Sequence, residues 1–249
     1  MSTLAVFFLL AEMLVVSAAE KPPATASAQQ ALEQLLPSSA FRLGMPLDEL
    51  EEVISSRFSN WERAERKRAL NNRKDIKLSP EARSTYVQSV VIVGNDKAAD
   101  RAFKYDFKLT SPLSGARVYS IVFGIKTTTK LISREDWASA LQARWGDEHG
   151  WFRSDTRLRA TYFFDPEWVP IEDRGDKCIA LHPFIFRLDE QNVDQVAAAS
   201  KLLETTGCWF KRDNTLLIKD GAAVQSTFFT VDLKRLVDDV LKRVSFGVR

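Results

Sequence analysis

The spacing of apolar residues along the chain changes repeatedly between a helical and a strand-like period. Residues 50–59 place apolar side chains at positions i, i+3, i+4 and i+8, one face of an amphipathic helix, and residues 137–146 repeat that spacing. Between them, the sequence FKYDFKL at 103–109 alternates strictly, with aromatic residues and a leucine on one side. Such alternation is typical of an antiparallel strand with one buried face. The chain is therefore predicted to have an α+β fold.

Further strands and helices follow from the same criteria. Antiparallel strands are predicted after each helix, at 85–93, 103–109 and 117–125 and then at 157–164 and 178–188. This order differs from the alternating strand and helix of a nucleotide-binding sheet. The C-terminal part is predicted to contain a helix at 193–206 ending at Gly207, a hairpin turning at Asp220-Gly221, and a last helix at 232–244.

The two amphipathic segments also match each other when the chain is displaced by 87 residues. Residues 50–59 then lie over 137–146, and Arg57 falls on Arg144. The alternative explanation is that two unrelated amphipathic helices share this spacing. The duplication predicts two related helix-plus-antiparallel-sheet units in tandem with a C-terminal α+β extension. The predicted boundaries are 39–130 for the first unit, 131–190 for the second, and 191–249 for a helix-hairpin-helix extension packed on the second unit.

The first residues are predicted to be a targeting segment. An apolar run at 5–16 ends in Ser17-Ala18-Ala19, and these small residues fit signal-peptidase cleavage after Ala19. Residues 1–19 are then a signal peptide, 20–38 a disordered leader, and the mature chain is periplasmic or secreted. Glu12 within the run counts against a signal peptide, because a charge in an apolar segment is costly, and the alternatives are an uncleaved anchor or a cytosolic protein. No stretch of the mature chain reaches the roughly 20 apolar residues of a membrane span.

Composition and motifs exclude several functional classes. With 35 basic and 33 acidic residues among 249, the formal charge of +2 is too balanced for a nucleic-acid-binding protein. The sequence contains no phosphate loop, serine-hydrolase elbow, zinc-protease helix or EF-hand motif. His149 follows Asp147 and Glu148, where a solvated turn competes with an acid–base or metal site; His182 is expected to be a core or edge residue. We expect no catalysis, cofactor or metal.

Cys178 and Cys208 are the only cysteines in the sequence. An exported chain folds in an oxidising compartment, where such a pair is expected to form a disulfide. The bond would close a loop of about 30 residues and stabilise the fold by roughly 3–4 kcal/mol in the chain-entropy model.

The most strongly charged stretch runs from Arg57 to Arg83, where nine basic residues outnumber four acidic ones. A solvated helix and loop would explain it. The functional interpretation is a basic surface for an acidic protein partner, with weak contact to anionic lipid or glycan as a further role. The candidate binding residues on this surface are Trp61, Arg63, Arg66 and Arg68.

Residues 41–50, FRLGMPLDEL, resemble the opening of the SmpA/OmlA-type outer-membrane assembly lipoproteins and of the tandem-repeat β-lactamase-inhibitor proteins. Arg144-Trp145-Gly146 is similar to the aromatic-glycine pair that ends such helices, so the resemblance covers about 41–59 and 133–146. It implies a helix pair packed on a small antiparallel sheet, and a place in the cell envelope. The families share no catalytic residues, and this sequence lacks the lipidated cysteine of the assembly lipoproteins.

Together these observations predict a non-enzymatic protein that binds another protein in the cell envelope, as an assembly accessory or scaffold. The alternative is an inhibitor of a periplasmic or foreign enzyme, which exposed Trp151, Trp168 and residues 165–173 would favour. A third hypothesis is a hydrolase in which His149 meets distant carboxylates.

Overall fold

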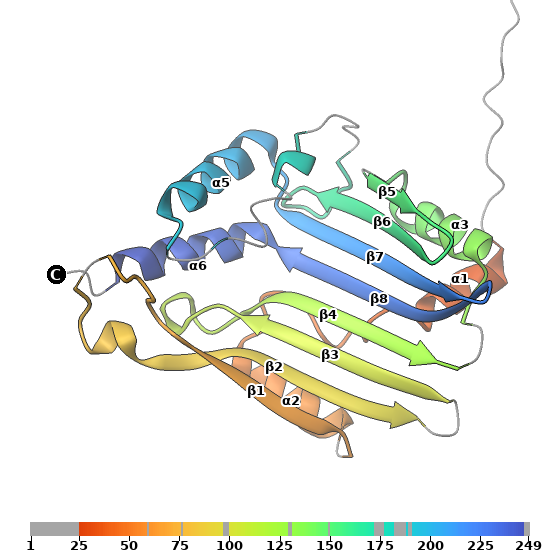
Figure 1. Cartoon of the computed structure of the whole chain (residues 1–249), viewed down its shortest axis with the longest axis horizontal. Coiled ribbons are helices and arrows are strands. Elements are labelled where there is room, and N and C mark those ends of the chain that lie inside the picture. The colour runs from red at the N-terminus through yellow and green to blue at the C-terminus, as the bar shows by residue number, and fades with distance from the viewer. Residues whose placement is uncertain are drawn as a thin grey trace, which may run out of the picture.

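The computed structural model of the chain describes residues 25–58, 60–75, 77–96, 100–128, 131–148, 150–171, 177–181, 188 and 191–246. These residues form helices around an eight-stranded antiparallel sheet, which confirms the α+β class (Figure 1). The predicted signal peptide with its cleavage site, His149 and His182 lie outside the described residues. None of the described helices is long and apolar enough to cross a membrane.

The sheet has the strand order β1-β2-β3-β4-β8-β7-β6-β5. Its strands are β1 (Glu62–Ala69), β2 (Thr85–Asp96), β3 (Arg101–Leu109), β4 (Val118–Thr127), β5 (Gly150–Arg153), β6 (Arg157–Phe164), β7 (Phe210–Lys219) and β8 (Ala222–Asp232). Neighbouring strands are consecutive in the chain except at the centre, where β4 pairs with β8 from Ser120 opposite Val231 to Lys126 opposite Gln225. Two series of four strands therefore meet at this central pair. The predicted C-terminal hairpin supplies β7 and β8 within the same sheet.

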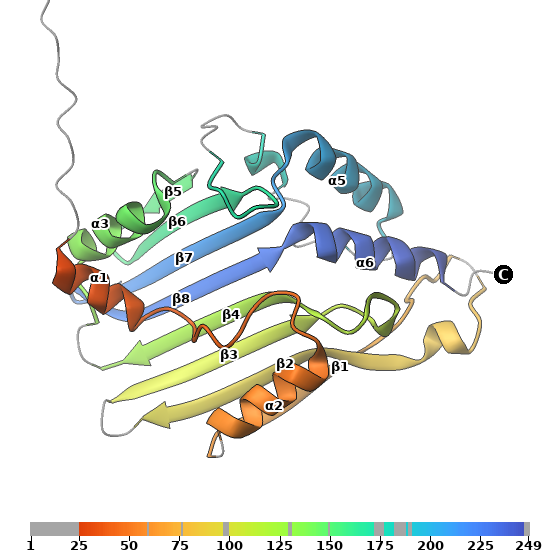
Figure 2. The ribbon, with the colours of Figure 1, turned by 180° about the vertical axis from the view of Figure 1, so that it is seen from behind.

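Three helices lie on one face of the sheet, α1 (Ala26–Glu33), α2 (Leu47–Arg57) and α3 (Arg134–Trp145) (Figure 2). Acidic residues occupy the first turn of α2 and α3, where they stabilise a helix N-terminus, and the Ser133 hydroxyl accepts a hydrogen bond from the amide of Asp136 at the start of α3. Between these helices and the sheet lies the main core, which includes Tyr105 and Phe107 of the alternating strand β3.

The two remaining helices, α5 (Val193–Thr206) and α6 (Leu233–Ser245), pack together at the end of the sheet where β8 finishes. They form a second core with Phe163 of β6, Val231 of β8 and the Cys178–Cys208 disulfide. The predicted disulfide is thereby confirmed. Its two cysteines join the segment after β6 to the segment before β7, so it holds the end of α5 against the sheet.

Helix α6 is also tied to the first half of the chain. The buried Asp239 carboxylate accepts hydrogen bonds from the amide and hydroxyl of Ser111, at 2.9 and 2.6 Å, and from Nε of Arg243 at 2.9 Å. Nδ2 of Asn71 donates to the carbonyl oxygen of Arg243 at 2.7 Å and to that of Phe246 at 3.2 Å. Asn71 thus satisfies carbonyl groups that the C-terminus of a helix leaves unpaired.

The structure differs from the sequence-based expectation in three segments. Residues 26–33, placed in a disordered leader, form α1 because the Thr25 hydroxyl caps it and Ala28 and Leu32 are buried. The basic stretch contains the strand β1, whose backbone pairs with β2 along its whole length. In the strand predicted at 178–188, residues Ile179–Leu181 form a turn of 3-10 helix next to the disulfide, and 182–187 and 189–190 lie outside the described residues.

Reduction of the Cys178–Cys208 disulfide is expected to lower the free energy of unfolding by about 3–4 kcal/mol, because the loop no longer restricts the unfolded chain. Denaturant unfolding with and without a phosphine reductant measures this difference. The double variant Cys178→Ala/Cys208→Ala is the control, since its midpoint must not respond to the reductant. An unchanged midpoint for the reduced wild-type protein would contradict a stabilising role.

Candidate functional site

The face of the sheet opposite α1, α2 and α3 is only partly covered. Side chains alternate along a strand, so Lys104, Asp106 and Lys108 point away from the core that contains Tyr105 and Phe107. Helices α5 and α6 cover this second face only at one end (Figure 1). We call the rest the basic sheet face; the charged residues that the register places on it include Glu62, Arg66, Lys104, Asp106, Lys108, Lys126, Arg157 and Arg159.

Positive charge and one exposed aromatic ring characterise the basic sheet face. In that set, basic residues outnumber acidic residues by six to two. Phe152 of β5 lies opposite Arg159, and 53% of its surface is exposed. Aromatic and arginine side chains are enriched at protein interfaces. The combination favours an interaction surface for an acidic partner.

A buried ion network fixes one arginine of this face. Asp213 Oδ2 lies 2.6 Å from Nζ of Lys211 and 2.6 Å from Nη2 of Arg159, and the Thr161 hydroxyl donates to Asp213 Oδ1 at 2.6 Å. Lys211 is completely buried and Asp213 nearly so. The Lys211 ammonium and the Asp213 carboxylate are both removed from water and fixed by their ion pair. Asp213 in turn holds Arg159 in one orientation at the border between the second core and the basic sheet face.

Burial acts oppositely on these two charged groups. It lowers the pKa of Lys211, since a buried ammonium is less stable than a neutral amine. Burial alone would raise the pKa of Asp213, but the charge of Lys211 and the hydrogen bonds from Lys211, Thr161 and Arg159 outweigh it and hold that pKa below its usual value. Asp213 is therefore ionised at neutral pH, as the network requires.

The four residues proposed from the basic stretch do not form one site. Trp61 packs on Phe58 and Phe103 and lies directly over Gly94, at the margin of the main core. Arg63 pairs with Glu51 of α2 and with Glu65. Both residues therefore belong to the helix-covered face.

The other two residues of the basic stretch have different surroundings. Arg66 is exposed and lies on the basic sheet face opposite Ser89, whereas Arg68 is partly buried near Tyr86 and Arg243. Alternating charges on the edge strand β1 also discourage pairing with a second sheet. Only Arg66 therefore belongs to the basic sheet face. The other residues of this face include Lys104, Lys126, Arg157 and Phe152, and they come from strands that the sequence did not predict to lie in one sheet.

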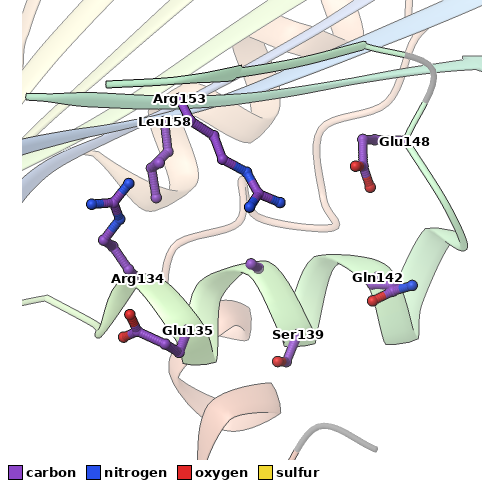
Figure 3. A pocket seen from close by; sticks show the side chains of 8 residues that line it. Arg134, Glu135, Ser139, Gln142, Glu148, Arg153 and Leu158 are labelled. Carbon is purple, nitrogen blue, oxygen red and sulfur yellow. The ribbon is translucent and has the colours of Figure 1, made fainter. Parts of the chain in front are cut away.

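A polar cavity of about 300 Å³ lies between α3 and the strands β5 and β6. Figure 3 shows Arg134 of α3 and Arg153 of β5 extending into it, with Glu148 on its other side and Leu158 at the sheet. Two arginines and two glutamates line it, so its charge selects neither an anion nor a cation. Within the described parts of the chain, no three metal-ligating side chains are grouped to hold a metal ion.

Comparisons of the chain with known protein families, with curated proteins and with solved structures found no match.

Replacing Asp213 with asparagine is expected to lower the free energy of unfolding by about 3–5 kcal/mol at pH 7, because Lys211 is left buried without its carboxylate. A carboxyl group whose pKa is lowered by folding stabilises the protein above its unfolded pKa of about 4, and this contribution is lost as pH falls through the folded pKa. The difference between wild type and Asp213→Asn should therefore shrink in acid.

Denaturant unfolding at pH 7 and at successively lower pH measures this difference. The exposed Asp155 serves as control, since Asp155→Asn should leave stability nearly unchanged at every pH. A wild-type advantage over Asp213→Asn that stays constant into strong acid would show that the carboxylate charge is not responsible.

Proposed function

We propose that this chain is a non-enzymatic binding protein of the cell envelope, an assembly accessory or scaffold that docks an acidic protein partner on its basic sheet face. The observation that carries the proposal is the exposed Phe152 on a sheet face where basic side chains predominate. An aromatic anchor surrounded by cations suits a partner that presents an apolar patch within acidic residues.

The geometry of the surface favours a protein partner over a lipid surface. Arg159 is held by Asp213, so the position of its guanidinium is fixed relative to the sheet. Phe152 and Arg157 reach the same surface from two adjacent strands, so their relative positions are set by the sheet. Binding to an anionic lipid surface requires only positive charge near the membrane, so a fixed arrangement of side chains would add little affinity for lipid.

We also infer that the sheet consists of two related units. Helices α2 and α3 begin 87 residues apart, at Leu47 and Arg134, and each is followed after the same short gap by an edge strand. From β1 and from β5 the chain then proceeds strand by strand toward the centre. On this proposal the basic sheet face is composite, because Lys104 and Lys126 belong to the first unit and Arg157 and Arg159 to the second.

The location in the periplasm or outside the cell is part of the same proposal. The disulfide is consistent with an oxidising compartment, where such bonds persist. The apolar N-terminal run and its Ser-Ala-Ala ending support export by a cleaved signal peptide.

An inhibitor of an enzyme is the second candidate function, and one loop favours it. Trp168 and Val169 are exposed at the tip of the turn after β6, where the Asp165 carboxylate accepts hydrogen bonds from the amides of Glu167 and Val169. A rigid loop that presents apolar side chains is suited to enter a cleft. Residues 172–176 and the side chain of Trp151, named with it from sequence, lie outside the described residues.

The proposal is tested with the variant Lys104→Glu/Lys126→Glu/Arg157→Glu. The tagged chain, residues 20–249, is used to capture partners from a crosslinked native envelope fraction, and mass spectrometry identifies them. We expect one envelope protein, recovered stoichiometrically by wild type, to be reduced at least about tenfold by the variant, because three attractions become repulsions. Binding of the purified partner should weaken as salt is raised.

The matched control carries the same charge change at exposed positions outside this surface, Lys77→Glu/Arg83→Glu/Lys201→Glu. It must retain the partner. Equal recovery by both variants would overturn the proposed surface. Recovery of a soluble enzyme that the chain inhibits would favour the inhibitor, and charge-dependent binding to anionic vesicles without any protein partner would identify a lipid surface instead.

A further inference from the structure

On the opposite face of the sheet, α1 and the segment that leads from α1 to α2 cross in front of the strands (Figure 2). Two cavities on this face meet at Arg212. One has a volume of about 450 Å³ and extends toward Arg144; the other has about 510 Å³ and extends toward Arg235. Arg212 and Thr230, from β7 and β8, line both cavities. We call the combined space the Arg212 groove.

Arg212 differs from the other arginines that line this groove. Arg42 pairs with Glu49, Arg144 with Glu33, and Arg235 with Asp232. No carboxylate among the described residues pairs with Arg212. Its Nε donates to the Thr230 hydroxyl at 3.3 Å, and its guanidinium carbon lies 4.5 Å from the ring centre of Trp145. The terminal nitrogens of Arg212 therefore have no anionic partner within the described chain.

Arg212 is half-buried, and a cation that is partly removed from water is less favourable when no anion compensates it. Burial, with a further contribution from the positive charge of Arg144, lowers the pKa of Arg212 to about 10. Because this pKa still lies well above 7, the side chain stays charged at neutral pH. Aromatic rings offset part of the desolvation through cation–π contacts, since Phe164 and Trp168 also lie within 5.5 Å of the guanidinium carbon.

The walls of the groove combine aromatic rings with charged side chains. The carboxylates of Glu33 and Asp232 line it, but each is paired with another arginine, Arg144 or Arg235. The aromatic residues are Phe41, Trp145, Phe210, Phe228 and Trp168, whose indole stacks on Phe210 with 4.1 Å between ring centres and 13° between planes. Trp168 adopts a φ of 63°, in the left-handed region that large side chains rarely occupy. The hydrogen bonds to Asp165 hold this strained turn, and so keep the indole beside Arg212.

We propose that the Arg212 groove binds a small amphipathic carboxylate. Its two oxygens accept hydrogen bonds from the terminal nitrogens of Arg212, and its alkyl or aryl body lies against Trp145 and Trp168. Planar guanidinium and carboxylate groups match each other in this geometry. Each cavity has the size of a typical small-molecule site. Of the arginines that line the groove, Arg212 is the one with which no carboxylate of the described residues pairs. The site is independent of partner docking, because it lies on the other face of the sheet.

Isothermal titration calorimetry with decanoate, below its micellar concentration, tests the proposal. We expect decanoate to bind wild type at least about tenfold more tightly than the uncharged decanol, since a charged hydrogen bond is worth about 1.5–3 kcal/mol. Arg212→Met should lose this preference. Arg134→Met, an arginine of the separate cavity beside α3, should retain it.

The comparison of decanoate with decanol on wild type needs no variant and therefore holds even if Arg212→Met folds poorly. Arg212→Lys provides a second variant, which keeps the charge without the forked donors and should bind decanoate with intermediate affinity. Circular dichroism verifies that each variant is folded. Equal affinity for the two ligands, no binding by wild type, unchanged binding by folded Arg212→Met, or tighter binding of decyl phosphate than of decanoate would each overturn the proposal.

Discussion

Pairing between β4 and β8 is the interaction on which the rest of the structure depends. It joins two series of strands into one sheet, and it removes two long strand edges from solvent. Phe123 and Phe228 lie opposite each other in this pair and are buried in the main core. Both candidate surfaces cross this line, because Lys126 lies on one face of β4 and Ile121 on the other.

Strand β7 carries an ion pair on one face of the sheet and, on the other, an arginine without a carboxylate partner among the described residues. Lys211, Arg212 and Asp213 are consecutive, so the first and third side chains point to one face and the second to the other. Lys211 and Asp213 neutralise each other beneath the second core, whereas Arg212 emerges among aromatic rings that provide no carboxylate. The alternation of the strand therefore separates the cation from the acid beside it in sequence. This separation underlies our assignment of an anionic ligand to the groove.

The sequence predicted those elements whose local pattern agrees with their environment. Burial of alternate side chains explains the pattern of β3, and burial along one face explains α5, which ends at Gly207. The apolar residues of α6 likewise lie on its buried face. Strand β1, ERAERKRA, has no such pattern, because its conformation is imposed by backbone pairing with β2. The candidate surfaces were not predictable for a related reason: Arg66, Lys126 and Arg159 come to lie on one face of the sheet only through strand order and register. Arg212 is half-buried beside Trp145 and Trp168, which are distant in sequence.

The hydrogen bond from Asn71 to the end of α6 joins residues 172 positions apart. The loop after the first strand therefore cannot reach its final conformation until the last helix of the chain is present. Contacts of such high sequence separation slow folding, because a large loop must close before they form. A chain built in this way stays incomplete through most of its synthesis. If the chain is exported as we propose, this order of events lets it cross the membrane unfolded and acquire its compact form on the other side.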